Sequence, residues 1–482
     1  MKRRAVILGG IGGALALGAL LRPEDRGGVH SAYFTQLSAA LDRGELATPT
    51  LVIDRQVMLE NIATLSAHLR NRFDYRIVAK SLPSLPLLQA TMEASGSRRL
   101  MLFHQPFINQ VAATFTDADI LLGKPMPVAA AANFYRDFKG GDFKPARQLR
   151  WLLDTPERLL EYRELADALE QDFQICIEID VGLHRGGVNR DEQLVAMLEV
   201  IEASPRLRFS GFMGYEPHIV KIPVGSPATY RDRAMARYAH YLEVARGVLG
   251  ERWPRDVPLN AGGSPTYQMY NEGDYPFNEI AAGSCLVKPS DFDLPTLADH
   301  RPASYIATPV LKRQEGVQLP GIDLGRLQSL WNTNRARTFF TYGGYWKAEL
   351  ESPQGLYYNG LYGRSTNQEM VNGSRSVNLL PGDWIFLRPT QSEFVFLQFG
   401  DIAVYDQGEI VARWPVLEQH SFCLTLQGAF ISLTPFAAWR SLAYCLPTSR
   451  VGVVTGLSRW KKLKASPCIT SMVFSSSCIT GW

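Results

Sequence analysis

The stretch that decides the fold is an apolar run that passes directly into a glycine-rich loop, Gln174-Ile-Cys-Ile-Glu-Ile-Asp180-Val-Gly-Leu-His-Arg185-Gly-Gly-Val188. Residues 174–180 are mostly apolar and predict a buried strand. The loop that follows holds a histidine, Arg185 and three glycines. Glycine lets the backbone approach a ligand closely, and arginine offers a planar fork to an anionic or phenolic oxygen. A surface turn with solvated charges is the alternative interpretation.

Strand-like and helix-like segments alternate on both sides of this stretch, from Thr48 to about Val287. Further strands are expected at 50–53, 75–79, 120–122, 150–153 and 209–213, and helices at 55–69, 85–94, 156–171 and 191–203. Such alternation favours a parallel sheet, and its total length suits eight strand–helix units. We therefore predict an α/β fold with a (β/α)8 TIM-like barrel over residues 46–300.

The pattern changes after about Arg301, where glycine and proline separate short apolar runs. These runs lie at 303–311, 337–341, 383–387, 394–399, 402–405 and 410–414. Helical spacing is weak, so we predict a second, mostly-β domain over residues 301–418. Residues 419–482 differ from both domains, since no Asp or Glu follows Glu418 while six Lys or Arg do. This atypical tail is either a non-native extension, such as a shifted reading frame, or a genuine irregular tail.

The N-terminal residues 1–28 have the appearance of an export signal or membrane anchor. Lys2, Arg3 and Arg4 precede the uncharged run 5–21, which is short for a membrane span of about 20 residues. The arginine pair suits the twin-arginine route. We expect an exported protein, either periplasmic or anchored to the inner membrane by this segment. The alternative is a buried N-terminal helix in a cytoplasmic protein.

The overall composition is that of an ordinary globular protein with a sizeable core, at 46% hydrophobic and 20% charged residues. The formal net charge is only +3, and no basic stripe with interleaved aromatic residues is present. We therefore expect no nucleic-acid partner.

A second chemically suggestive stretch is Arg76-Ile-Val-Ala-Lys80-Ser-Leu-Pro-Ser84. Lys80 closes an apolar strand, and the carboxyl ends of barrel strands face the active site. A partly desolvated lysine at that place is a nucleophile for an aldehyde. The alternative is a solvated charge at the end of a strand.

A third stretch, Leu259-Asn-Ala-Gly262-Gly263-Ser264-Pro-Thr266-Tyr267, follows the last strand of the alternating series. Backbone N–H groups and hydroxyls at this place in a barrel form a phosphate cradle, although a Gly-Gly-Ser run alone is mostly a turn. Together the three stretches suggest a phosphorylated aldehyde cofactor.

Over about residues 46–418 the chain resembles the fold-type III pyridoxal-phosphate enzymes, in the alanine racemase N-terminal domain branch that holds D-threonine aldolase and D-serine dehydratase. Residues 180–188 are similar to the D-V-G-x-H-R-x-G-V signature of this branch, which is the most specific match. Residues 214–218 look like its G-Y-E-G-H, and residues 262–266 match its phosphate loop. Residues 48–54 look like its opening strand, and residues 344–348 and 381–383 resemble its C-terminal β domain.

The resemblance implies a set of roles in holding pyridoxal 5'-phosphate. Lys80 would carry the cofactor as a Schiff base and move the α-proton of the substrate. Arg185 would contact the phenolic oxygen, and Tyr215 would lie beside the ring. The phosphate would be held by Gly262, Gly263, Ser264 and Thr266. The resemblance also implies a small amino-acid substrate of the D-series and a homodimer in which one subunit's β domain closes the other's site.

Two departures from the family pattern bear on the reaction. The branch carries a metal pair, His-x-Cys, after a proline, whereas this chain reads Pro389-Thr-Gln391-Ser-Glu393. A zinc site of Gln and Glu is poor, so we assign no metal ligands and hold a divalent metal doubtful. The lysine motif of the family, H-A-K-T-H-K, also lacks both histidines here, in residues 78–83.

The reaction is therefore open among three alternatives. Overall resemblance favours a lyase that performs aldol cleavage or dehydration. The missing metal pair favours a metal-independent racemase, for which Tyr342 or Tyr345 are the candidates for a second acid/base. The third alternative is a pyridoxal-phosphate-binding protein without turnover.

Overall fold

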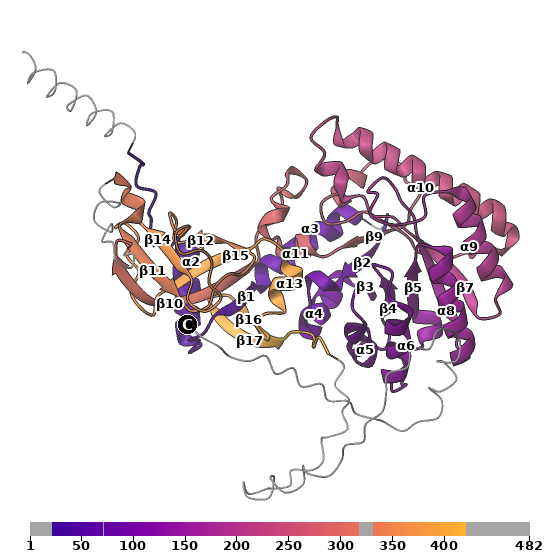
Figure 1. Cartoon of the computed structure of the whole chain (residues 1–482), viewed down its shortest axis with the longest axis horizontal. Coiled ribbons are helices and arrows are strands. Elements are labelled where there is room, and N and C mark those ends of the chain that lie inside the picture. The colour runs from indigo at the N-terminus through magenta and orange to yellow at the C-terminus, as the bar shows by residue number, and fades with distance from the viewer. Residues whose placement is uncertain (1–21, 71, 318–330, 421–482) are drawn as a thin grey trace, which may run out of the picture. The chain divides into compact units, whose positions relative to one another are not determined.

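The computed structural model describes residues 22–70, 72–317 and 331–420, and within them a closed barrel of eight parallel strands (Figure 1). The barrel strands are β2 (Asp74–Val78), β3 (Arg99–Leu102), β4 (Asp119–Leu122), β5 (Leu149–Leu153), β6 (Phe173–Glu178), β7 (Leu207–Met213), β8 (Leu259–Ala261) and β9 (Glu279–Ala282). Pairing of β9 with β2 closes the ring. The predicted TIM-like barrel is confirmed.

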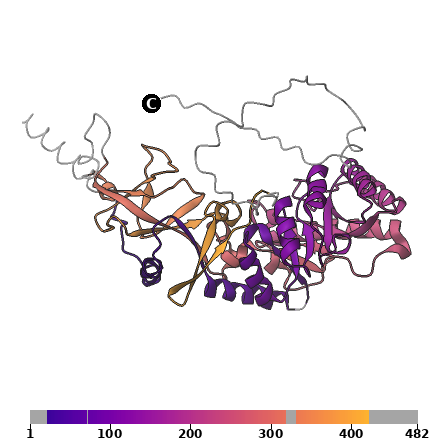
Figure 2. The same cartoon turned by 90° about the horizontal axis from the view of Figure 1, so that it is seen from below.

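Helices surround this barrel on its outside, as Figures 1 and 2 show. They are α3 (Arg55–Leu69), α4 (Leu85–Ser95), α5 (Gln105–Thr114), α6 (Val128–Asp137), α7 (Pro145–Gln148), α8 (Pro156–Leu169), α9 (Asp191–Ala203), α10 (Pro227–Leu249) and the short α11 (Ser284–Val287). Local sequence sets where several of them begin. Thr155 accepts a hydrogen bond from the backbone of α8, and Ser226 does the same for α10. In both cases a proline follows at the first helical position, where its fixed φ suits the helix.

The second domain is a nine-stranded sheet, so the predicted mostly-β character is confirmed. Its strands are β1 (Thr50–Asp54), β10 (Ser304–Glu315), β11 (Arg337–Thr341), β12 (Ala348–Ser352), β13 (Tyr357–Tyr358), β14 (Met370–Gly373), β15 (Trp384–Pro389), β16 (Asp401–Asp406) and β17 (Glu409–Pro415). Helix α2 (Ala32–Arg43) packs on it through Phe34, Leu37 and Leu41.

Two sequence-based predictions are corrected by this arrangement. The strand expected at 50–53 is β1, which pairs with β10 and β16 in the second sheet and not with any barrel strand. All five of its residues are buried, as in a barrel strand, so the sequence pattern does not separate the two sheets. The run 394–399, expected as a strand, instead forms part of helix α13 (Ser392–Phe396) and the turn after it. Short apolar runs of this length fit either structure.

The predicted leader and tail fall largely outside the described residues, namely on 1–21 and 421–482. Residues 22–28 lie against the β domain, where the Arg26 backbone N–H donates to Asn334 Oδ1 at 2.9 Å. The Gly28 N–H donates to the Gln354 carbonyl at 3.1 Å. Within the described ranges, no helix combines the length and apolar character that a membrane crossing requires.

A charged layer fills the inside of the barrel below the site. Arg76 and Glu279 are fully buried, and Arg76 Nε lies 2.5 Å from Glu279 Oε1. Burial alone would raise the pKa of Glu279, but Arg76 and Arg99 together hold that pKa below its ordinary value. Asn260 Nδ2 donates to the same carboxylate at 2.8 Å. This buried network therefore fixes Asn260 at the base of the cavity described next.

Candidate active site

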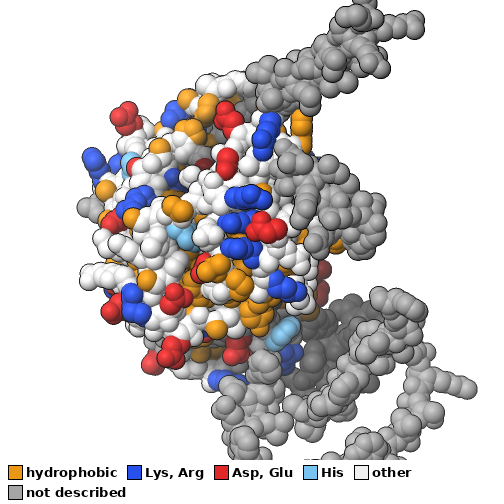
Figure 3. All heavy atoms as spheres, turned by 90° about the vertical axis from the view of Figure 1, so that its left-hand side faces the viewer, with side chains coloured by type: hydrophobic (Ala, Val, Ile, Leu, Met, Phe, Trp, Pro, Cys, Tyr) orange, Lys and Arg blue, Asp and Glu red, His pale blue; other side chains and the backbone are white. Residues whose placement is uncertain are grey.

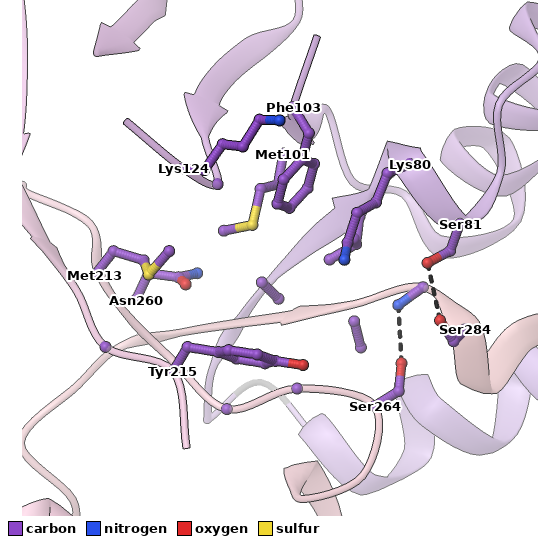
Figure 4. Close-up of a pocket in the computed structure, with 18 of the residues that line it drawn as sticks. Lys80, Ser81, Met101, Phe103, Lys124, Met213, Tyr215, Asn260, Ser264 and Ser284 are labelled. Atoms are coloured by element: carbon purple, nitrogen blue, oxygen red, sulfur yellow. Dashed lines mark hydrogen bonds between the residues drawn. The ribbon is translucent and has the colours of Figure 1, made fainter. Parts of the chain in front are cut away.

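A cavity of about 500 Å³ lies at the carboxyl ends of the barrel strands, a volume typical of small-molecule and cofactor sites (Figure 4). It is walled by the segments that follow all eight barrel strands, β2 to β9, together with a residue of α13. Of the residues predicted from sequence, six line it: Lys80, Arg185, Tyr215, Gly262, Gly263 and Ser264.

Lys80 lies on a single 3₁₀ turn, η1 (Ala79–Ser81), directly after β2. Its side chain is about one-third exposed and points into the cavity (Figure 4). The Nζ atom lies 4.7 Å from the centre of the Phe103 ring and 2.6 Å from Glu393 Oε1. The turn is held by a hydrogen bond between Ser81 Oγ and Ser284 Oγ at 2.9 Å. The lysine is thus presented to the cavity on a supported turn.

The loop after β6 is shaped by Asp180, whose carboxylate accepts hydrogen bonds from the backbone N–H groups of Gly182 and His184. His184 Nδ1 also lies 2.6 Å from that carboxylate. Burial would raise the pKa of Asp180, but these hydrogen bonds hold it below its ordinary value. Gly187 has φ of +95°, and a Cβ there would lie 2.6 Å from the Asp180 nitrogen. Only glycine at position 187 allows the loop to pass this close to the backbone of Asp180, and this path directs Arg185 to the cavity.

Arg185 and Tyr215 lie together on one wall, with the guanidinium carbon 5.2 Å from the centre of the tyrosine ring. This is the geometry of a cation–π contact. Burial, with Glu216 and Glu393 nearby, raises the pKa of Tyr215 to about 12, and Arg185 opposes that rise. The phenol is therefore a neutral hydrogen-bonding group near pH 7.

The glycine–serine loop after β8 lines the same cavity as Lys80, and Figure 4 shows Ser264 below Lys80. Ser264 Oγ accepts hydrogen bonds from the backbone N–H groups of Gly283 and Cys285, each at 3.1 Å. A Cβ at Gly263 would lie 2.9 Å from the Tyr215 ring. These two N–H groups fix the Ser264 hydroxyl, which keeps its own proton to donate to an anion, on a surface that excludes larger side chains.

Thr266, assigned to the phosphate loop from the sequence, does not line the cavity. Its side chain is fully buried, and its hydroxyl donates to Glu216 Oε1 at 3.2 Å. Tyr270 donates to the same oxygen at 2.8 Å. Thr266 therefore supports the loop from behind, because the turn at residues 263–267 directs its side chain inward.

Several lining residues were not assigned a role from the sequence: Lys124, Asp154 and Glu178, with Phe103 and Phe292. Glu178, at the end of β6, is only 8% exposed. Burial raises the pKa of Glu178 to about 7, the Asp154 carboxylate adds to the rise, and Arg185 opposes it. The sequence signal that could have identified Glu178 as a site residue was its place at the end of a predicted strand, two residues before Asp180.

The positions that the family gives to a metal pair are otherwise engaged. Gln391 Nε2 donates to Asp291 Oδ2 at 2.9 Å, and Glu393 pairs with Lys80. The described part of the chain contains no group of three side chains suited to holding a metal ion. Tyr342 and Tyr345 are exposed on the β domain and are not among the residues lining the cavity.

A barrel with a lysine at the end of its first strand, facing a glycine–serine cradle after its seventh, defines a class of cofactor-dependent barrel enzymes. Residues 53–291 match the family model described as alanine racemase, N-terminal domain. The barrel of this chain belongs to that family, whose members depend on pyridoxal phosphate.

Comparison with solved structures shows the same fold at low identity. D-threonine aldolase from Filomicrobium marinum is 15% identical with a TM-score of 0.61, and the match covers 77% of this chain and 95% of that one. D-threo-3-hydroxyaspartate dehydratase from Delftia sp. HT23 is 17% identical with a TM-score of 0.57, covering 77% and 98%. Alanine racemase from Bacillus anthracis is 15% identical with a TM-score of 0.57, again covering 77% and 98%. No curated protein matches the chain.

Proposed function

We propose that this chain is a pyridoxal-phosphate-dependent lyase that acts on a β-hydroxy-D-amino acid. The observation that carries the proposal is that Lys80 Nζ and the Gly262–Ser264 cradle open onto one cavity at the carboxyl end of the barrel. A cavity lined by both an amine and an anion cradle suits a ligand that carries an aldehyde and a phosphate.

The residues present fit this cofactor. Bound there, it would supply an electron sink for the bond that breaks at the amino acid's α-carbon. Lys80 would hold its aldehyde carbon, Arg185 its phenolic oxygen, and Gly262, Gly263 and Ser264 its phosphate. Aromatic and apolar side chains, among them Phe103, form part of the lining beside Lys80.

Two groups of this chain hold or move protons at the site. Lys80 lines the cavity and, as a free amine, would deliver or remove a proton at the substrate's α-carbon. Glu178 carries a carboxyl whose pKa of about 7 lets it hold a proton near neutral pH. A neutral carboxyl next to Arg185 leaves the guanidinium's charge free for the anionic oxygen of the cofactor.

Two of the structurally similar proteins support the lyase proposal. They are D-threonine aldolase and D-threo-3-hydroxyaspartate dehydratase, and their names give a β-hydroxy amino acid as the substrate. A metal-independent racemase is the second candidate, because Gln391 and Glu393 are engaged with Asp291 and Lys80. Racemisation needs an acid/base on the opposite face of the substrate. Tyr342 and Tyr345, exposed on the β domain, would have to supply it from a partner subunit.

We propose that the chain pairs through its β domain as a homodimer. Figure 3 shows hydrophobic side chains among interspersed charges of both signs on the face that looks out from this domain. Exposed apolar residues of the domain include Tyr342, Tyr345, Leu361, Tyr362 and Leu380. We also propose export directed by the N-terminal segment 1–28, to be tested by cell fractionation of the full-length chain.

The test of the lyase proposal is a mass-detected panel of D- and L-amino acids with the cofactor-loaded full-length protein. Aldol cleavage releases glycine and an aldehyde, and dehydration releases ammonia and a keto acid. Exchange of the α-hydrogen with inversion and no product loss would identify the racemase instead. No reaction with any amino acid, despite cofactor bonded to Lys80, would support a binding protein without turnover.

A further inference from the structure

The second domain contributes one charged side chain to the cavity, Glu393 on helix α13. Its Oε1 lies 2.6 Å from Lys80 Nζ, which is the length of a charge-assisted hydrogen bond. Both side chains are about one-third exposed, so the pair faces the open part of the cavity. Any substrate that reacts at Lys80 therefore comes within reach of the Glu393 carboxylate.

The position of Glu393 is fixed by the chain around it. Val395 and Phe396, on the same helix, are fully buried. Thr390 precedes the helix cap. Its carbonyl accepts a hydrogen bond from the Asp291 N–H at 3.1 Å, and its N–H donates to the Lys347 carbonyl at 2.9 Å. One further anchor is Arg388, whose guanidinium forms two hydrogen bonds to Asp293, at 2.7 and 2.8 Å. The carboxylate is thus held at the site by a rigid support, as proton transfer requires.

Glu393 also acts on the opposite wall of the cavity. It is one of the charges that raise the pKa of Tyr215, although burial is the main cause. Glu393, Lys80 and Tyr215 all line the same cavity. A small amino acid held beside Lys80 would therefore have its side chain within the space that these three residues line.

Cleavage of a β-hydroxy amino acid requires a base for the β-hydroxyl proton, because the oxygen becomes an aldehyde carbonyl. We propose that Glu393 is this base and that its contact with Lys80 passes the proton on, so that the pair forms a relay. This inference rests on the proposed lyase function and names the residue that makes aldol cleavage possible.

The proton balance of the relay closes on itself. The hydroxyl proton moves to Glu393 as the Cα–Cβ bond breaks, and the electron pair of that bond stays with Cα. The aldehyde leaves, the proton crosses the 2.6 Å contact to the amine of Lys80, and Lys80 delivers it to Cα. The products are glycine and an aldehyde, with no net gain or loss of protons and no oxidant. A metal ion is not required, since the carboxylate performs the deprotonation.

The test compares Glu393→Gln with Glu393→Asp and with Glu349→Gln, an exposed position of the same domain. Each cofactor-loaded protein is treated with EDTA and given a panel of β-hydroxy-D-amino acids, and aldehyde release is measured. Glu393→Gln is expected to lose cleavage by about 10²- to 10⁴-fold, the usual contribution of a positioned acid or base. Glu393→Asp is expected to recover part of the loss, and Glu349→Gln to match the wild type.

Two further readouts separate the relay from a structural role. Borohydride trapping of pyridoxal phosphate on the Lys80 peptide is expected to be the same in Glu393→Gln and wild type. Deuterium exchange at the α-carbon of glycine, which needs Lys80 but no hydroxyl base, is expected to persist in Glu393→Gln. Cleavage by Glu393→Gln at about the wild-type rate would overturn the relay. So would loss of the trapped cofactor, or wild-type cleavage abolished by EDTA and restored by Mn²⁺. If wild type traps no cofactor at Lys80, the proposed function itself fails.

Discussion

Replacing Glu178 with glutamine should change the pH dependence of stability in the cofactor-free protein. The ordinary pKa of this carboxyl is 4.5, and in the folded protein it is about 7 because the side chain is buried beside Asp154. The folded state therefore binds a proton that the unfolded chain releases, so this group makes stability fall as pH rises from about 4.5 to about 7. A shift of this size corresponds to about 3 kcal/mol. Glutamine cannot ionise, so the variant lacks this loss.

Urea unfolding of wild type and Glu178→Gln between about pH 4 and pH 8.5 measures the effect. The difference in free energy of unfolding, variant minus wild type, is expected to rise by about 3 kcal/mol across this range and to level off above about pH 8. Glu164→Gln, on the exposed face of α8, gives the baseline for exchanging a carboxylate for an amide. A difference for Glu178→Gln that stays constant with pH would refute the argument that Glu178 holds a proton in the folded state.

Three other changes follow from the geometry of the site and the barrel. Arg185→Leu should weaken the affinity for pyridoxal phosphate, measured by absorbance titration, by about 10- to 100-fold, because a hydrogen bond to a charged group is lost. Arg185→Lys should weaken that affinity less. Gly283→Ala should lower the free energy of unfolding by about 1–3 kcal/mol in the same urea assay, because the new Cβ would lie 2.6 Å from a backbone oxygen of β2. Its control, Gly247→Ala, has open space around it in α10 and should raise the free energy of unfolding slightly. Glu279→Gln should lower the free energy of unfolding by about 3–5 kcal/mol, since Arg76 would then remain buried without its main partner.

The barrel and the main parts of the site were accessible from the sequence because their signals are local. Helix boundaries at Arg55–Leu69 and Asp191–Ala203 follow from periodicity and agree with the structure. The loop at 180–188 was recognisable because its aspartate, glycines and arginine act on one another within nine residues. Interactions between residues this close in the chain can be predicted from the local sequence.

What the sequence could not supply are contacts between distant segments. The membership of β1 in the second sheet depends on its pairing with β10 and β16, which the buried pattern of residues 50–54 does not specify. The side chain of Thr266 turns away from the cavity because Glu216, far from it in the chain, accepts its hydroxyl. Glu393 was judged only as a replacement for a metal ligand, since its approach to Lys80 requires the two domains to meet.

The central claim is that a single amine, Lys80, bonds the cofactor that the glycine–serine cradle holds. Borohydride reduction of the protein mixed with pyridoxal phosphate, followed by digestion and peptide mass analysis, tests it most directly. The account predicts one reduced cofactor per chain, on the peptide that contains Lys80, with none in Lys80→Ala and much less in a Gly263→Leu variant that fills the cradle. Modification of Lys124 or of surface lysines in place of Lys80, or equal labelling of Lys80→Ala, would contradict it.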